Sequence, residues 1–100
     1  MEINVQFVKM PTSESLEAFA IKKLERLEKR YEWIIKAEVF YKLDNDPKKK
    51  GKICDIQLSL PGPRIFARSN EENFEVATDE TINDLEKQLK KRKKDMKPHL

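Results

Sequence analysis

The sequence predicts an α+β fold, a two-layer sandwich in which two helices cover one face of a four-stranded mixed sheet. Four short segments alternate apolar and polar residues, which is typical of half-buried strands. Two longer segments repeat apolar residues at helical spacing, which is typical of amphipathic helices. The segments follow one another in the order β-α-β-β-β-α. A chain of 100 residues can bury one modest core, so residues 1–100 are expected to form a single domain.

The first strand and the first helix occupy the N-terminal third of the chain. Residues 2–8 alternate strictly, which predicts a strand that Pro11 ends. Thr12 or Ser13 can cap the helix that follows, which is predicted over about residues 13–30. The apolar stripe of this helix holds Leu16, Phe19, Ala20, Leu24, Leu27 and Tyr31.

Three further strands are predicted over residues 34–43, 52–60 and 64–69, where period-two alternation returns. Residues 44–52 contain Asp, Asn, Pro and Gly, which are typical of a hairpin loop, here with a basic tip. A Pro-Gly-Pro turn at residues 61–63 joins the last two strands. The helix between the first and second strands allows them to lie parallel and adjacent through a right-handed crossover. The three later strands then form an antiparallel meander.

The second helix is predicted over about residues 73–95. Its apolar stripe holds Phe74, Ala77, Thr78, Ile82, Leu85 and Leu89, with Met96 as a further candidate. Each helix offers only one apolar stripe, so each must bury that stripe against the sheet. Both helices are therefore expected side by side on the same face.

Charge is distributed unevenly along the chain. Residues 87–97 hold seven Lys or Arg and one Asp, whereas residues 1–86 hold fourteen basic and seventeen acidic side chains. A mildly acidic body with a strongly basic end favours nucleic acid or an acidic surface as the partner.

Helical spacing places many of the basic residues on the faces that the apolar stripes leave outside. The candidate RNA-binding residues are Lys22, Lys23, Arg26, Lys29, Lys87, Lys90, Lys91 and Lys94. Arg92 and Lys93 add further positive charge, and residues 48–52 form a secondary basic contact. Adjacent packing of the helices would merge the two stripes into one track of cations, which a phosphate backbone requires.

Other interpretations of these residues stay open. Basic helical faces are often only solvated, and spacing such as that of Glu25 and Lys29 is typical of ordinary surface pairing. Phe66 and Arg68 form a base-stacking platform if they face outward, but an inverted strand that buries Phe66 is the favoured alternative. Tyr31 and Trp33 are expected to pack under a loop rather than stack on bases.

Enzyme chemistry has little support in the sequence. His99 is the only histidine and lies near the C-terminus, so a histidine triad or histidine metal site is not expected. With only Gly51 and Gly62, the chain has no glycine-rich phosphate loop. Cys54 is the only cysteine and falls on the apolar face of a strand, so it is expected to be buried and inert. We expect no catalytic site, metal, cofactor or small-molecule substrate.

Nothing in the sequence predicts a membrane protein. No signal peptide opens the chain, and no run of about 18 apolar residues is present. A protein in the cytoplasm that makes no membrane contact is expected.

Residues 73–97 resemble the signature segment of the ribosome hibernation-promoting factors, a family also called ribosome-associated inhibitors or subunit-interface proteins. The matching residues are Ala77, Thr78, Asp79, Leu85, Gln88, Leu89, Lys91 and Lys93. Residues 13–29 are also similar, through Leu16, Phe19, Lys23, Arg26, Leu27 and Glu28. The resemblance covers nearly the whole chain and includes the order of its elements.

The resemblance implies a non-catalytic protein whose partner is the small ribosomal subunit with its rRNA. Family members bind the channel used by messenger RNA and by the anticodon ends of transfer RNA. They silence and protect ribosomes when growth slows. The chain stops at Leu100 and so resembles the short type. A monomer off the ribosome is expected.

The sequence departs from the family pattern at two places. Asn83 and Asp84 stand where relatives commonly have Asp-Lys, which puts one phosphate contact in doubt, and Thr78 replaces a usual aliphatic residue. Two other functions remain as alternatives: a double-stranded RNA-binding module, and an adaptor whose basic face docks an acidic protein.

Overall fold

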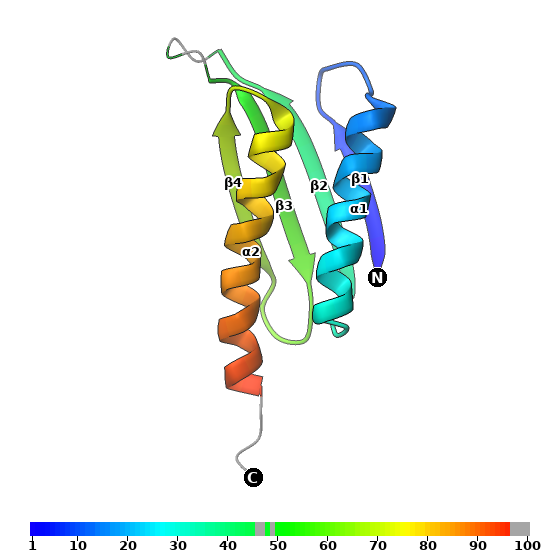
Figure 1. The fold of residues 1–100 in the computed structure, drawn as a ribbon, viewed down its shortest axis with the longest axis vertical. Helices are drawn as coiled ribbons and strands as arrows, with labels where there is room; N and C mark the ends of the chain where they lie inside the picture. Colours follow the sequence, from blue (N-terminus) through cyan, green and yellow to red (C-terminus); the bar gives the residue numbers. More distant parts are fainter. Residues whose placement is uncertain (46–47, 49, 97–100) are drawn as a thin grey trace.

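The computed structural model describes residues 1–45, 48 and 50–96. The elements are β1 (Glu2–Phe7), α1 (Glu14–Arg30), β2 (Lys36–Leu43), β3 (Lys52–Ser59), β4 (Ile65–Glu71) and α2 (Phe74–Met96) (Figure 1). This order confirms the predicted one, and the predicted bounds differ by at most two residues at either end of an element. The Ser13 side chain caps α1 by accepting a hydrogen bond from the Leu16 amide.

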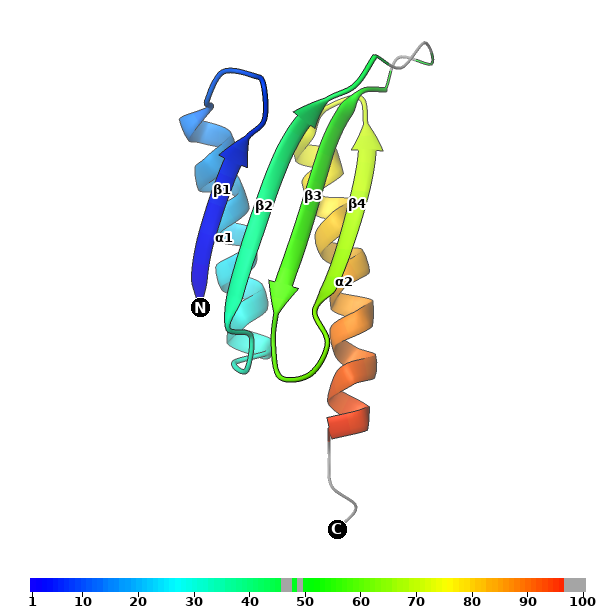
Figure 2. The same ribbon diagram turned by 180° about the vertical axis from the view of Figure 1, so that it is seen from behind.

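The sheet has the order β1-β2-β3-β4. Strand β1 lies parallel to β2, and the other two pairs are antiparallel, as predicted. The register aligns Val5, Val39, Ile56 and Ala67 in one row across the four strands. Because side chains alternate between faces, this row marks the face that the helices cover. Figure 2 shows that the opposite face carries no helix.

Both helices lie on the same face of the sheet, which confirms the predicted two layers (Figures 1 and 2). Helix α1 follows β1 and α2 follows β4, and these two strands run in the same direction. Each helix runs opposite to the strand before it, so α1 and α2 are parallel to each other (Figure 1). The largest fully buried apolar residues of the helices are Leu24, Leu27, Leu85 and Leu89. Met96 does not extend the apolar stripe of α2, because its side chain is exposed.

The residues around Cys54 form a buried polar contact between the sheet and α2. The Thr81 hydroxyl donates to the Cys54 carbonyl oxygen at 3.1 Å. Cys54 itself is fully buried, and burial raises the pKa of its thiol to about 11. A thiol held in this protonated form is a poor nucleophile, in agreement with the expectation of an inert cysteine.

Two glycines allow the hairpins to close. Gly51 has φ +139°, and a Cβ there would collide with the carbonyl oxygen of Asp44. Gly62 has φ +92° in the turn between β3 and β4. Lys49, which belongs to the predicted basic tip, and His99 lie outside the described residues. Neither helix within the described ranges carries a stretch apolar enough to cross a bilayer.

Candidate nucleic-acid interface

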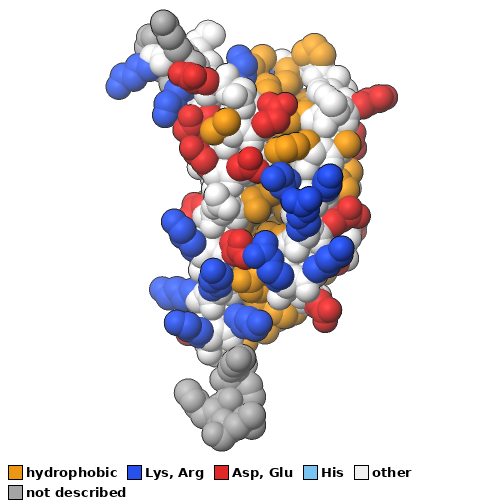
Figure 3. All heavy atoms as spheres, viewed as in Figure 1, with side chains coloured by type: hydrophobic (Ala, Val, Ile, Leu, Met, Phe, Trp, Pro, Cys, Tyr) orange, Lys and Arg blue, Asp and Glu red, His pale blue; other side chains and the backbone are white. Residues whose placement is uncertain are grey.

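The surface that α1 and α2 turn away from the sheet, here called the helical face, concentrates basic side chains. Figure 3 shows Lys and Arg gathered over the lower part of both helices, with acidic side chains near the start of α2. Because the helices run parallel and Arg30 at the end of α1 pairs with Glu86, the basic C-terminal half of α1 lies beside the middle of α2, and the basic end of α2 continues from there. The negative end of each helix dipole also favours cations there. The parallel direction could have been derived from the element order, since each helix follows a strand of the same direction.

Seven of the eight predicted contact residues are exposed and have no salt-bridge partner among the described residues. They are Lys22, Arg26, Lys29, Lys87, Lys90, Lys91 and Lys94. Cations without acidic partners can neutralise phosphates without first breaking an ion pair. The structure therefore places these seven cations on the helical face, exposed and free to contact phosphate groups.

Lys23 is the exception among the eight. Its ammonium group lies 3.2 Å from an oxygen of Asp79 on α2 and 5.2 Å from the centre of the Phe19 ring. A second ion pair also crosses between the helices, where Arg30 lies 2.6 Å from Glu86. The expected surface pair of Glu25 with Lys29 is not present among the described residues. The two ion pairs above link α1 to α2 rather than successive turns of α1.

Two shallow hollows on the helical face are lined by cations. One, of about 470 Å³, is lined by Lys22, Glu25, Arg26, Glu28 and Lys29. The other, of about 380 Å³, is lined by Tyr31, Lys90, Lys93 and Lys94. The first hollow, on α1, mixes three cations with two carboxylates, whereas the second, between the end of α1 and α2, has three cations and no acid. The second hollow is therefore the better fit for a phosphate group.

The aromatic residues at the end of α1 pack internally, as predicted. Tyr31 is 5% exposed, and Trp33 meets it edge to face with 5.9 Å between ring centres. The Lys93 ammonium group lies 5.8 Å from the Tyr31 ring centre and covers it. Burial, and next the charge of Glu86, raise the pKa of Tyr31. A ring covered in this way supports the second hollow rather than stacking on a base.

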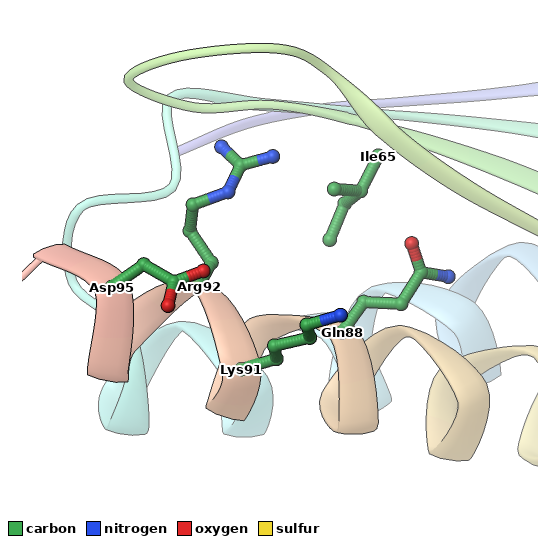
Figure 4. Close-up of a pocket in the computed structure, with 5 residues that line it drawn as sticks. All are labelled: Ile65, Gln88, Lys91, Arg92 and Asp95. Atoms are coloured by element: carbon green, nitrogen blue, oxygen red, sulfur yellow. The ribbon is translucent and has the colours of Figure 1, made fainter.

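Arg92 does not belong to the helical face. It extends from α2 toward the connection between β3 and β4, whereas Lys91 lies along the helix (Figure 4). Its two terminal nitrogens donate to the carbonyl oxygens of Pro61 and Pro63, each at 2.9 Å. The charge of Arg92 is therefore held beside the turn between β3 and β4 rather than on the helical face, while its two bonds to neutral carbonyl oxygens leave that charge in place.

The open face of the sheet is of mixed charge. Phe66 lies on it and is 68% exposed, so the favoured expectation of a buried Phe66 is wrong. The reason is that Ile65 and Ala67 are the residues of β4 that point toward the helices. Lys42 pairs with Asp55 at 3.5 Å on strands β2 and β3. An aromatic ring is available here, but Lys42 is balanced by Asp55, whereas seven cations of the helical face have no salt-bridge partner among the described residues.

A metal site has no support in the structure. The described residues contain no group of three or more His, Cys, Asp or Glu side chains able to hold a metal ion.

Comparison with known proteins identifies the family. Residues 3–97 match the family described as Sigma 54 modulation protein / S30EA ribosomal protein. A ribosome hibernation promoting factor from Pseudomonas putida is 26% identical over 93 residues, which cover 93% of this chain and 87% of that protein.

Two solved structures are also similar. A ribosomal subunit interface protein from Coxiella burnetii has a TM-score of 0.82 and 28% identity, with 93% of this chain and 98% of that chain covered. The N-terminal domain of Thermus thermophilus Protein Y has a TM-score of 0.77 and 27% identity, with 91% and 98% covered. Since the family match runs from β1 to the end of α2, the chain belongs to the Sigma 54 modulation protein / S30EA ribosomal protein family.

Proposed function

We propose that this chain is a ribosome hibernation factor that binds the small ribosomal subunit and its rRNA. It occupies the channel used by messenger RNA and by the anticodon ends of transfer RNA, and it inhibits translation during slow growth or stress. Residues 1–100 then act as a single ribosome-binding domain, in the cytoplasm and as a monomer off the ribosome. The relatives named as a ribosome hibernation promoting factor and as a ribosomal subunit interface protein support the ribosome as partner. The family is one of non-enzymatic binding factors, which confirms the prediction that the chain is not an enzyme.

The observation that carries the proposal is the set of seven exposed, unpaired cations on the helical face. Two helices fixed side by side on a sheet present these charges in a rigid array, which lowers the entropic cost of binding. The logarithm of the binding constant should fall linearly with the logarithm of the salt concentration. Each phosphate that the array neutralises contributes about −0.7 to −0.9 to this slope, called the salt slope below. Lys23 joins the set once its ion pair with Asp79 opens.

Steric competition follows from this mode of binding. Contacts to phosphates position a protein on RNA but carry no sequence code, so selectivity comes from the fit of the folded domain to the channel. A rigid domain held there leaves no room for messenger RNA or for the anticodon end of transfer RNA. Translation is then blocked without any chemical step.

Co-sedimentation with purified small ribosomal subunits tests the proposal. The variant Lys90→Glu/Lys94→Glu reverses two charges beside one hollow of the helical face. The variant Arg64→Glu/Arg68→Glu makes the same change in net charge on exposed residues that belong to neither helix. We expect the first variant to lose co-sedimentation at moderate salt while the second retains most of it, both folding normally by circular dichroism. Equal binding by the two variants would refute the helical face as the site.

Competition experiments decide between the proposal and its alternatives. Added messenger RNA with initiator transfer RNA should displace the protein from the subunit, whereas a synthetic RNA duplex should compete poorly. Strong binding to the duplex would favour a double-stranded RNA-binding module instead. A complex that survives nuclease treatment would favour an adaptor docked on an acidic protein.

A further inference from the structure

Helix α2 continues beyond its own apolar stripe. Leu89 is its last buried residue, and among residues 90–96 only Arg92 is even partly buried. Figures 1 and 2 show that the last part of the helix runs past the end of the sheet. Lys90, Lys91 and Lys94 all lie in this segment. Apolar packing therefore does not hold the part of α2 that carries these three cations.

Arg92 makes the contact that holds this part of α2 in place. Its Nη1 donates to the carbonyl oxygen of Pro61 and its Nη2 to that of Pro63, each at 2.9 Å. A guanidinium group is a rigid planar fork, so two bonds made at once fix both the distance and the direction of the helix. One turn earlier, Gln88 Nε2 donates to the Phe66 carbonyl oxygen at 3.0 Å. Both side chains bind the backbone of the segment that leads into and through the start of β4 (Figure 4).

The turn between β3 and β4 is shaped to receive this fork. Gly62 lies between the two acceptor residues with φ +92°, and a Cβ there would stand 3.0 Å from Arg92 Nη1. The absence of a side chain therefore allows the guanidinium group to approach. The prolines at 61 and 63 restrict the backbone on either side, so the acceptors belong to a stiff turn.

We infer that Arg92 is a positioning residue, which clamps the last turns of α2 to the Pro61–Gly62–Pro63 turn and so holds Lys90, Lys91 and Lys94 in a fixed array. The clamp itself stands on the geometry of the free protein, and its consequence for binding rests on the proposed function. An array that is already ordered loses less conformational freedom on binding RNA, which strengthens the complex. Arg92 thus serves binding without contacting a phosphate.

Hydrogen exchange and ribosome binding together test this inference. Arg92→Lys keeps the charge but loses the fork, so the amides of residues 90–96 should exchange about 3- to 10-fold faster. The affinity for purified small subunits should fall by a similar factor, with an unchanged salt slope because no phosphate contact is lost. The matched control Lys94→Gln should change the salt slope and leave the exchange rates unchanged. Its amides should exchange as in the wild type, while the salt slope becomes shallower by about 0.7 to 0.9.

Two outcomes would overturn the inference. One is wild-type exchange at residues 90–96 in Arg92→Lys. The other is a shallower salt slope in Arg92→Gln, equal to that of Lys94→Gln, which would make Arg92 a phosphate contact. Gly62→Ala leaves Arg92 in place and should also speed the exchange, since a Cβ at φ +92° strains the turn and stands 3.0 Å from Arg92 Nη1. If the wild type fails to bind small subunits, the proposed function fails, and the exchange data still decide whether the clamp exists.

Discussion

The Tyr41 hydroxyl on β2 lies 2.6 Å from the Thr78 hydroxyl on α2, and both residues are fully buried. Thr78 also donates its single hydroxyl proton to the Phe74 carbonyl oxygen at 2.7 Å. It can therefore only accept from Tyr41, which fixes the direction of the bond. This contact uses a hydroxyl that an aliphatic side chain at position 78 would lack. It gives the buried phenol an acceptor.

Replacing Thr78 with Val should destabilise the protein by about 1 to 3 kcal/mol, because the buried Tyr41 hydroxyl loses its acceptor while the side-chain shape is kept. Tyr41→Phe should cost less, since the Thr78 hydroxyl keeps its bond to Phe74. In the double variant, Tyr41→Phe should recover part of the loss caused by Thr78→Val. Urea unfolding of the four proteins measures this coupling. Strictly additive losses would show that the two hydroxyls do not depend on each other.

Asp79 holds Lys23 away from any phosphate, so Asp79→Asn should strengthen binding to small ribosomal subunits. The freed cation should make the salt slope steeper by about 0.7 to 0.9. The cost in stability should stay below about 1 kcal/mol, because both partners of the ion pair are partly exposed. Titration of small subunits at several salt concentrations measures the slope.

Glu75→Gln provides the matched control for this prediction. It removes one negative charge from the first turn of the same helix, where Glu75 is exposed and makes no salt bridge among the described residues. Its salt slope should equal that of the wild type. If both variants tighten binding equally, the effect comes from net charge and not from the release of Lys23.

The free energy of unfolding should fall as the pH rises above about 9. Burial raises the pKa of Cys54 from 9.0 to about 11, so the native state keeps the thiol proton where the unfolded chain has released it. Stability from this group is full below pH 9 and is lost by about pH 11, a total of about 3 kcal/mol. Burial also raises the pKa of Tyr41, which extends the loss to higher pH. Urea unfolding of the wild type and of Cys54→Ala measures it, and the variant should show a flatter profile between pH 9 and 10.

Periodicity and element order predicted the fold because each apolar stripe has only one place to be buried. The same periodicity found the seven available cations, since it assigns residues to a helix face. It did not distinguish Arg92 from the lysines around it. That distinction depends on Pro61 and Pro63, which lie 31 and 29 residues earlier in the chain. Likewise, the spacing of Glu25 and Lys29 suggested an ion pair within α1. The ion pairs of Lys23 and Arg30 instead join α1 to acidic residues of α2.

Alternation along β4 separated Phe66 from its neighbours but did not show which set faces the helices. The choice is made by α2, which covers Ile65 and Ala67. Ile65→Thr should therefore destabilise the protein by about 1 to 3 kcal/mol, since a buried apolar group is lost and a hydroxyl is brought into its place. Phe66→Thr should change the free energy of unfolding by less than about 0.5 kcal/mol, because the ring is 68% exposed and threonine suits a strand. Urea unfolding compares the two variants directly. A larger loss for Phe66→Thr than for Ile65→Thr would mean that the orientation of β4 is reversed, and with it the assignment of the open face of the sheet.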